Sequence, residues 1–281
     1  TQNNDPVSAQ GSATVTIVIA GSSITVSKSA NPSTINEPGG NVQFTVRVDN
    51  LSTSDVVTIN SLTDNRFGNL NGQGNCTVPR NIAVGGNYTC SFSRNIQGNG
   101  NTTHVDVITA AGLDDDGDPV SGQGSATVTI ANLPSSITVS KSANPSSVPE
   151  PGGNVQFTIL IQNTSVADVV TINSLSDDRF GNLAGQGTCT VPRTIAVGGS
   201  YSCSFTMPIN GNAGTVHTNR VTASGLDDDG AGVSGNDDAT VTITNVTPSI
   251  QVTKSANPTS VPEPGGNVQF TVQIQNTSTS Q

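Results

Sequence analysis

Two acidic clusters, each beside a glycine, are the residues of this chain best suited to bind a ligand. They comprise Asp114, Asp115, Asp116 and Asp118 around Gly117, and Asp227, Asp228 and Asp229 before Gly230. Carboxylates gathered at a turn suit Ca²⁺, which prefers oxygen ligands. The pattern lacks the glutamate at position twelve of an EF-hand, which excludes that type of site. The same residues are good hairpin-turn chemistry, so a calcium site and a solvated turn are both open interpretations.

The four cysteines form two pairs with one spacing, Cys76 with Cys90 and Cys189 with Cys203. Two cysteines at a fixed spacing predict a disulfide within each pair. A zinc site needs about four ligands, and no CxxC motif or nearby histidine supplies them. Two reduced core cysteines are the alternative. Because disulfides persist in oxidising compartments, the pairs predict an extracellular or cell-surface protein.

Residues that often carry catalysis are sparse. His104 and His217 are the chain's two histidines, and neither has a GxSxG motif or another histidine beside it. A hydrogen-bonded structural role is therefore expected for both. Asp106 and its counterpart Asn219 have the strand parity of apolar neighbours, so we expect them to be partly buried and bonded to the backbone. Without tryptophan and with two tyrosines, the chain offers little to line a sugar-binding cleft between paired carboxylates, and we expect no enzyme.

These residues lie within near-copies of one long block. The stretch ITVSKSANPSTINEPGGNVQFTV, residues 24–46, returns with few changes at 137–159 and 250–272. A lysine at a fixed place gives the period, because 141 − 28 = 113 and 254 − 141 = 113 for Lys28, Lys141 and Lys254. A period of 113 residues is the size of one independently folding domain and too long for a solenoid unit.

The repeat predicts the domain organisation. We expect a segment of a longer array, made of a repeat's tail over residues 1–21, complete repeats over 22–134 and 135–247, and the head of another over 248–281. Linkers such as 132–134 contain a proline, which restricts the backbone more than a Gly/Ser linker does. The sequons Asn50, Asn163 and Asn276 recur at one loop of each copy and are candidate glycosylation sites.

Within each repeat the pattern is that of β-strands. Val42, Phe44, Val46 and Val48 alternate with polar residues, which predicts a half-buried strand with these four side chains facing the core. Similar short runs are separated by Gly, Asn and Pro turns, and no segment has a helical period. About seven strands in roughly 110 residues is the size of an immunoglobulin-like sandwich. The predicted fold is all-β, with tandem immunoglobulin-like β-sandwich domains.

The charge of the chain excludes several partners. The formal net charge is −10, and charged residues make up 11% of the chain. A negative net charge disfavours nucleic acid and anionic membrane surfaces. We therefore expect no nucleic-acid partner and no direct membrane insertion of this segment.

A set of motifs resembles a known repeat family. These are NPSSVPEPGGNVQFTI, NSLSDDRFGNL, GTCTVP, VGGSYSCSF and VTASGLDDDG. Together they are similar to the Ig-like tandem repeats of unknown function in very large bacterial and archaeal surface proteins. The resemblance covers both complete repeats and the two fragments. It implies an extracellular β-sandwich array in a surface fibre, adhesin stalk or envelope layer, and it implies no activity or ligand.

The expected topology predicts where the acidic side chains gather. Asp168 and Asp227–Asp229 are expected at the end of a domain where the chain enters. Glu37 and Asp64 are expected at the opposite end, near the linker. We therefore expect Ca²⁺ to bind at the junction of neighbouring repeats, where six to eight oxygens could surround it. A weaker form of this hypothesis places the ion within one domain, between the hairpin tip and Asp168.

The sequence as a whole predicts a non-catalytic structural protein. We expect an extracellular filament or surface stalk, stiffened by disulfides and Ca²⁺, whose partners are neighbouring repeats or other copies in a fibre. The alternative is an adhesin module whose loops bind a glycan or a surface receptor. Differences among repeats that cluster on one group of loops would favour the alternative.

Overall fold

The computed structural model describes residues 2–18 and 20–279, which form strands and loops. This described part contains no helix, and therefore no apolar helix of membrane-spanning length. The chain divides into two units, Thr1–Asn132 and Leu133–Gln281. Residues 1, 19, 280 and 281 fall in the repeat fragments expected at 1–21 and 248–281 and lie outside the described residues.

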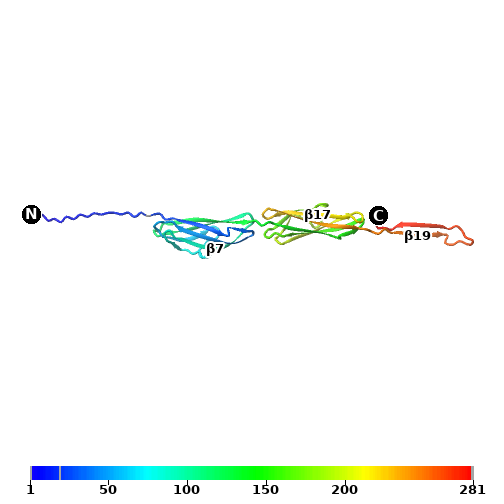
Figure 1. The fold of residues 1–281 in the computed structure, drawn as a ribbon, viewed down its shortest axis with the longest axis horizontal. Helices are drawn as coiled ribbons and strands as arrows, with labels where there is room; N and C mark the ends of the chain where they lie inside the picture. The colour runs from blue at the N-terminus through cyan, green and yellow to red at the C-terminus, as the bar shows by residue number, and fades with distance from the viewer. Residues whose placement is uncertain (1, 19, 280–281) are drawn as a thin grey trace. The chain divides into compact units, whose positions relative to one another are not determined.

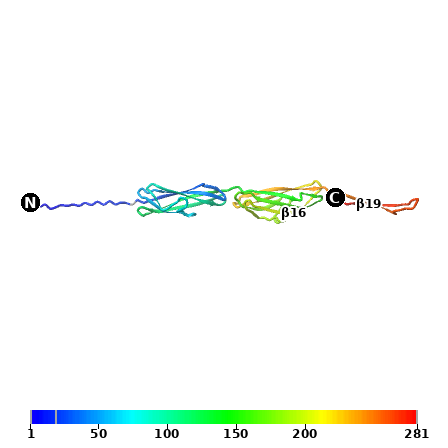
Figure 2. The ribbon, with the colours of Figure 1, turned by 90° about the horizontal axis from the view of Figure 1, so that it is seen from below.

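The first unit is a sandwich of two sheets whose long strands run along the length of the unit (Figures 1 and 2). One sheet has the order β1–β3–β7, and the other has the order β2–β9–β8–β4–β5, with β6 also paired to β4. β2 and β9 pair in parallel, and the other pairs are antiparallel. The strands are β1 (Ile24–Asn31), β2 (Thr34–Asn36), β3 (Gly39–Asn50), β4 (Val57–Asp64), β5 (Gly68–Asn69), β6 (Arg80–Ile82), β7 (Asn87–Gln97), β8 (Thr102–Asp114) and β9 (Pro119–Ala131).

The second unit repeats this topology one period later. Its sheets have the orders β10–β12–β16 and β11–β18–β17–β13–β14, with β15 paired to β13. A further antiparallel hairpin, β19 with β20, follows, and nearly all of its side chains are exposed. The strands are β10 (Ile137–Asn144), β11 (Ser147–Pro149), β12 (Gly152–Asn163), β13 (Val170–Asp177), β14 (Gly181–Asn182), β15 (Arg193–Ile195), β16 (Ser200–Asn210), β17 (Val216–Asp227), β18 (Gly232–Thr244), β19 (Ile250–Asn257) and β20 (Gln269–Asn276).

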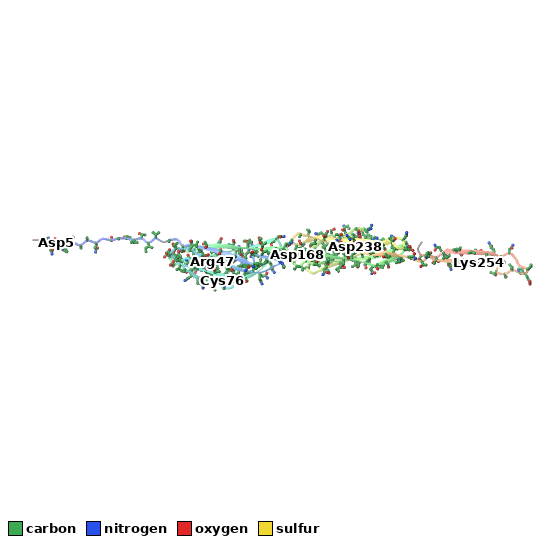
Figure 3. All side chains as sticks on the ribbon, viewed as in Figure 1. Asp5, Arg47, Cys76, Asp168, Asp238 and Lys254 are labelled. Carbon is green, nitrogen blue, oxygen red and sulfur yellow. A yellow bond between two sulfur atoms is a disulfide. The ribbon has the colours of Figure 1, made fainter. Side chains whose placement is uncertain are left out.

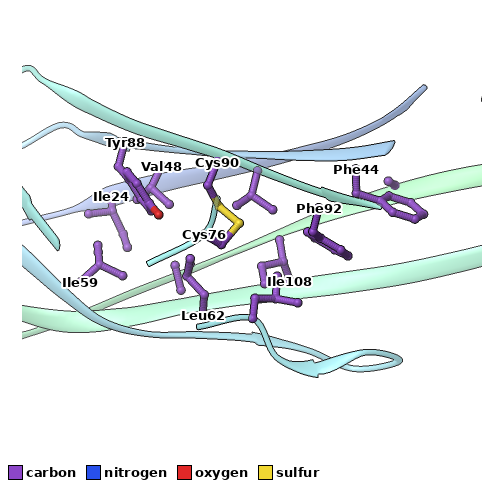
Figure 4. Packing of buried hydrophobic residues seen from close by; sticks show 14 of the residues in the cluster. Ile24, Phe44, Val48, Ile59, Leu62, Cys76, Tyr88, Cys90, Phe92 and Ile108 are labelled. Atoms are coloured by element: carbon purple, nitrogen blue, oxygen red, sulfur yellow. A yellow bond between two sulfur atoms is a disulfide. The ribbon is translucent and has the colours of Figure 1, made fainter. Parts of the chain in front are cut away.

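The core of each sandwich lies between its two sheets. In β3 the alternation of Val42, Phe44, Val46 and Val48 is confirmed, since each side chain is at most 1% exposed. They pack with buried residues of the facing sheet, including Ile59, Leu62 and Ile108, as Figure 4 shows for this cluster. The equivalent residues form the core of the second unit. The predicted all-β sandwich fold is thus confirmed.

Candidate functional site

Each sandwich contains one disulfide. Cys76 lies in the loop between β5 and β6, and it is bonded to Cys90 of β7 across 14 residues of sequence (Figure 4). The approach of the loop to β7 requires Gly74, which has φ +57°, because a Cβ atom there would lie 2.1 Å from the carbonyl oxygen of Ser91. Cys189 and Cys203 form the second bridge, also across 14 residues. The cysteines are therefore joined as pairs rather than held as reduced thiols.

The acidic tip of the first unit is a hairpin between β8 and β9 that hydrogen-bonds to itself. The amide of Asp118 donates to Oδ1 of Asp114 at 2.7 Å. Burial acts to raise the pKa of Asp114, but hydrogen bonds within its own turn, from the amides of residues 116–118, lower it below its usual range. The Asp114 side chain therefore stabilises its own turn as a carboxylate.

Asp116 has the opposite electrostatic environment. Its pKa is raised, first by burial and then by repulsion from Asp55, Asp115, Asp114 and Asp118. Asp55 lies in the loop before β4 and accepts a hydrogen bond of 2.7 Å from the Ser22 hydroxyl, just before β1. The end of the unit where the chain enters therefore carries several carboxylates close enough to repel one another.

The second unit has the same arrangement. Asp168 lies at one end of this unit (Figure 3) and accepts a hydrogen bond from the Ser135 hydroxyl at 2.5 Å. The amide of Val169 donates to Asp228 at 3.1 Å, which places the Asp168 loop beside the acidic tip. Oδ1 of Asp227 accepts the amides of Asp229 and Ala231, so Asp227 stabilises the turn as Asp114 does.

Glu37 lies at the opposite end of the first unit. Its amide donates to the carbonyl oxygen of Ala131, the last residue of β9, and its carboxylate accepts the amide of Gly100. Taken alone, neither unit brings ligand atoms of three described His, Cys, Asp or Glu residues within 4.8 Å of one another. Calcium binding at these acids stays a prediction.

The expectation that Asp64 lies near the linker as a calcium ligand is wrong. Its side chain is fully buried, and Oδ2 lies 2.5 Å from Nζ of Lys28. Its other oxygen accepts the amides of Arg66 and Phe67 at 2.8 and 3.0 Å. Both carboxylate oxygens are therefore occupied inside the sandwich. The physical reason is that Asp64 has the same strand parity as Leu62, so it faces the core.

Lys28 is the centre of this buried cluster. It projects from β1 in one sheet toward Asp64 of β4 and Asp106 of β8 in the other. Its Nζ lies 2.7 Å from Oδ1 of Asp106, and all three side chains have no exposed surface. Rings surround the ammonium group, with centroids at 4.6, 5.5 and 5.4 Å for Phe44, Phe67 and Phe92. Such cation–π contacts stabilise a charge that burial disfavours.

The two carboxyl groups that face Lys28 are held differently. Asp64 is fixed by the two backbone amides and by Lys28. Asp106 is not bonded to the backbone as expected: neither of its oxygens makes a contact with hydrogen-bond geometry, although one is 2.7 Å from Nζ of Lys28. Nε2 of His104, 3.4 Å away, is also not in hydrogen-bond geometry. The amine thus approaches Asp106 closely without a directed hydrogen bond.

The second unit keeps the lysine and one aspartate but replaces the other with asparagine. Nζ of Lys141 lies 2.5 Å from Oδ2 of Asp177, and the carboxamide of Asn219 donates to that same oxygen at 2.9 Å. Nζ also donates to the backbone oxygen of Asn219 at 3.1 Å. Burial lowers the pKa of Lys141 despite the opposing hydrogen bond and charge of Asp177. Oδ1 of Asn219 is buried without a hydrogen bond.

Sequence reasoning missed the lysine cluster, although strand parity could have found it. Lys28 has the parity of Ile24 in β1, and both are buried. A charged residue at an inward position requires an opposite charge on the facing sheet. Asp64 and Asp106 also occupy inward positions, which marks them as its partners.

The histidines have a structural role through ring stacking, and Nε2 of each is buried without the expected hydrogen bond. His104 stacks on Phe67 with ring centroids 5.6 Å apart, and His217 stacks in the same way on Phe180 at 5.7 Å. Two of the sequons also have structural roles. Asn50 is 1% exposed, and its amide donates to the carbonyl oxygens of Asp55, Ile82 and Ala83. Asn163 is likewise buried, so neither can carry a glycan in the folded chain.

Comparisons with known proteins show little. No family model and no curated protein matches the chain. Among solved structures it is similar to a 1.5-MDa bacterial ice-binding adhesin, with 16% identity, a TM-score of 0.29, and coverage of 82% of this chain and 68% of that one. A putative membrane-anchored protein of Corynebacterium diphtheriae is similar at 10% identity with a TM-score of 0.26, over 79% of this chain and 59% of that one. Red sea bream transglutaminase is similar at 11% identity with a TM-score of 0.26, over 80% of this chain and 32% of that one. The chain therefore spans about a third of that protein.

Proposed function

We propose that this chain is part of an extracellular structural protein, a filament or surface stalk built of β-sandwich repeats that act as spacers. The observation that carries the proposal is the recurrence of the same strand order, core and disulfide in both units. Disulfides in each unit support an oxidising location outside the cell. Each structural element repeats with the 113-residue period, as expected when every unit does the same mechanical task.

Electron microscopy of the native material tests the proposal. We expect beaded fibres with one bead per repeat, spaced on the order of 40 Å for strands of this length with their loops. Discrete globular oligomers would contradict it. The full chain should also fail to bind an array of glycans. Saturable binding to one glycan class would instead support the receptor-binding alternative.

We also propose that Ca²⁺ binds at the acidic loops of each unit. Besides burial, repulsion from the neighbouring carboxylates raises the pKa of Asp116, and this repulsion supports the proposal because a divalent cation would relieve it. A ligand at 100 times its Kd stabilises the folded state by about 2.7 kcal/mol, so chelator should lower the Tm by about 10 °C. Asp116→Asn and Asp228→Asn should each remove this effect from one unit. An unchanged Tm would make the acidic tips ordinary turns.

The expectation that neighbouring repeats share such a calcium site stays a prediction. Small-angle scattering by the full chain, with Ca²⁺ and with excess chelator, tests it. Chelator should broaden the distribution of distances between repeats if the ion joins them. Identical profiles would contradict a shared site, even if the Tm changes.

A further inference from the structure

The buried lysine of each unit lies against a carboxyl derivative in an environment suited to a chemical reaction. Lys28 and Lys141 have no exposed side-chain surface and are surrounded or covered by phenylalanine rings. A buried ion pair is often no more stabilising than apolar residues of similar volume. A gain in folding stability therefore does not explain why these charged side chains are buried, whereas a chemical reaction between them would.

The third member of the cluster is a carboxyl group in one unit and a carboxamide in the other. It is Asp106 in the first unit and Asn219 in the second, whereas the lysine and the other aspartate are kept. A neutral carboxamide cannot replace a carboxylate as a counter-ion. Both groups, however, have a carbon that an amine can attack, and attack on either gives the same product, an amide between the lysine Nζ and the side-chain Cγ.

We propose that each unit forms an internal amide cross-link, joining Lys28 to Asp106 and Lys141 to Asn219. Geometry supports the first bond, since Nζ of Lys28 is 2.7 Å from an oxygen of Asp106 and therefore within about 4 Å of its Cγ. In the second unit, Nζ of Lys141 and the carboxamide of Asn219 bind one oxygen of Asp177, and Nζ also donates to the backbone of Asn219.

The third side chain, Asp64 or Asp177, is placed to move the protons. Backbone amides fix one oxygen of each carboxylate and leave Oδ2 on the lysine amine. In the second unit Asp177 takes a proton from the Lys141 ammonium, and the neutral amine attacks Cγ of Asn219. The lowered pKa of Lys141 favours the neutral amine. Asp177 then transfers a proton from the attacking nitrogen to the departing amide nitrogen.

The products balance in both units. In the second, ammonia leaves, the new amide keeps one hydrogen on Nζ, and Asp177 ends as a neutral carboxyl group. In the first, the electrophile is the protonated carboxyl group of Asp106, water leaves, and Asp64 ends protonated. The step requires the neutral carboxyl form of Asp106, which leaves no net charge buried beside the Lys28–Asp64 ion pair. Each new bond would connect the two sheets of a sandwich, since β1 and β8 belong to different sheets.

Mass spectrometry of the reduced, intact 281-residue chain tests the proposal. Loss of ammonia and water should lower the mass by about 17 and about 18 Da, or about 35 Da in total, relative to the sequence. A mass equal to that of the sequence overturns the proposal. A deficit of only one of the two amounts overturns it for the unit whose loss is missing.

Peptide mapping separates the cross-link from succinimide formation, which gives the same losses. Trypsin should not cleave after Lys28 or Lys141, and branched peptides should join Lys28 to Asp106 and Lys141 to Asn219. Lys254 is the internal control: it lies against Phe270 as Lys28 does against Phe44, but its repeat in this chain does not include the two partner positions. Trypsin should cleave after it. Cleavage after all three lysines overturns the proposal.

A conservative substitution gives an independent test. Asn219→Asp alone makes the sequence about 1 Da heavier, but it then loses water instead of ammonia. The mature variant should therefore have the same mass as the mature unsubstituted chain, and a difference of about 1 Da contradicts the proposal. Lys141→Arg keeps the charge but removes the amine, so its deficit should fall to about 18 Da while far-UV circular dichroism still reports the fold. A persisting deficit of about 35 Da in this variant overturns the assignment to Lys141.

Discussion

Removal of one disulfide should destabilise one unit selectively. The Cys189–Cys203 bridge closes a loop with a sequence separation of 14, for which the chain-entropy model gives about 3 kcal/mol. For a domain of 113 residues, each kcal/mol corresponds to about 4 °C in Tm. The double substitution Cys189→Ala with Cys203→Ala should therefore lower the Tm of the second unit by about 12 °C.

Differential scanning calorimetry of the full chain measures this change. The matched control is the same pair of substitutions at Cys76 and Cys90, which should lower the other transition by a similar amount. Reduction of the unsubstituted chain should lower both transitions, because the geometry of the two bridges is the same. A shift below about 3 °C would refute the reasoning that the bridge acts mainly by restricting the unfolded chain. Equal shifts of both transitions in one variant would refute its assignment to a single unit.

Two further predictions concern buried polar groups. Asn163→Ala removes hydrogen bonds to the carbonyl oxygens of Asp168 and Ile195, so urea unfolding should show a free energy of unfolding lower by about 1–3 kcal/mol. The same substitution at the exposed Asn276 should change it very little. Equal losses in the two variants would contradict the structural role of Asn163. The pKa of His217 is lowered by burial and by the charge of Arg179, so its stabilising contribution is complete above its ordinary pKa and declines as pH falls from that value to the folded one. The Tm of the second unit should therefore fall less between pH 7.5 and 5.5 in His217→Gln, and an unchanged pH dependence would contradict this assignment.

The sequence predicted the strands and core because their signals are local. Alternation places Val42 and Phe44 on one face of β3 whatever the partner strand is, and the structure buries both. Strand ends have no such local signal because they depend on pairing: β8 runs from Thr102 to Asp114, the length over which β4 and β9 hydrogen-bond to it. The disulfide pairing also follows from the sequence, since each copy holds two cysteines.

The buried lysine cluster could not be read with the same ease because its members are distant in sequence. Lys28 and Asp106 come together only through the packing of two sheets. Asp64 is predicted among the calcium ligands because the expected topology places the end of its strand near the linker, but its inward position in β4 directs the side chain into the core instead. The sequon at Asn50 was misleading for the same reason, since its amide is used to hold three carbonyl groups of neighbouring loops.

The parallel pairing of β2 with β9 has a mechanical consequence. Thr34–Asn36 lie beside Thr129–Ala131, so the strand near the start of the unit and its last strand run in the same direction. When the two ends of a unit are pulled apart along the strands, the hydrogen bonds of this pair are loaded together in shear. They must then break at nearly the same extension, unlike the bonds of a hairpin, which open one after another. Resistance to tension is therefore set by the unfolding rate under load rather than by the equilibrium stability of the unit.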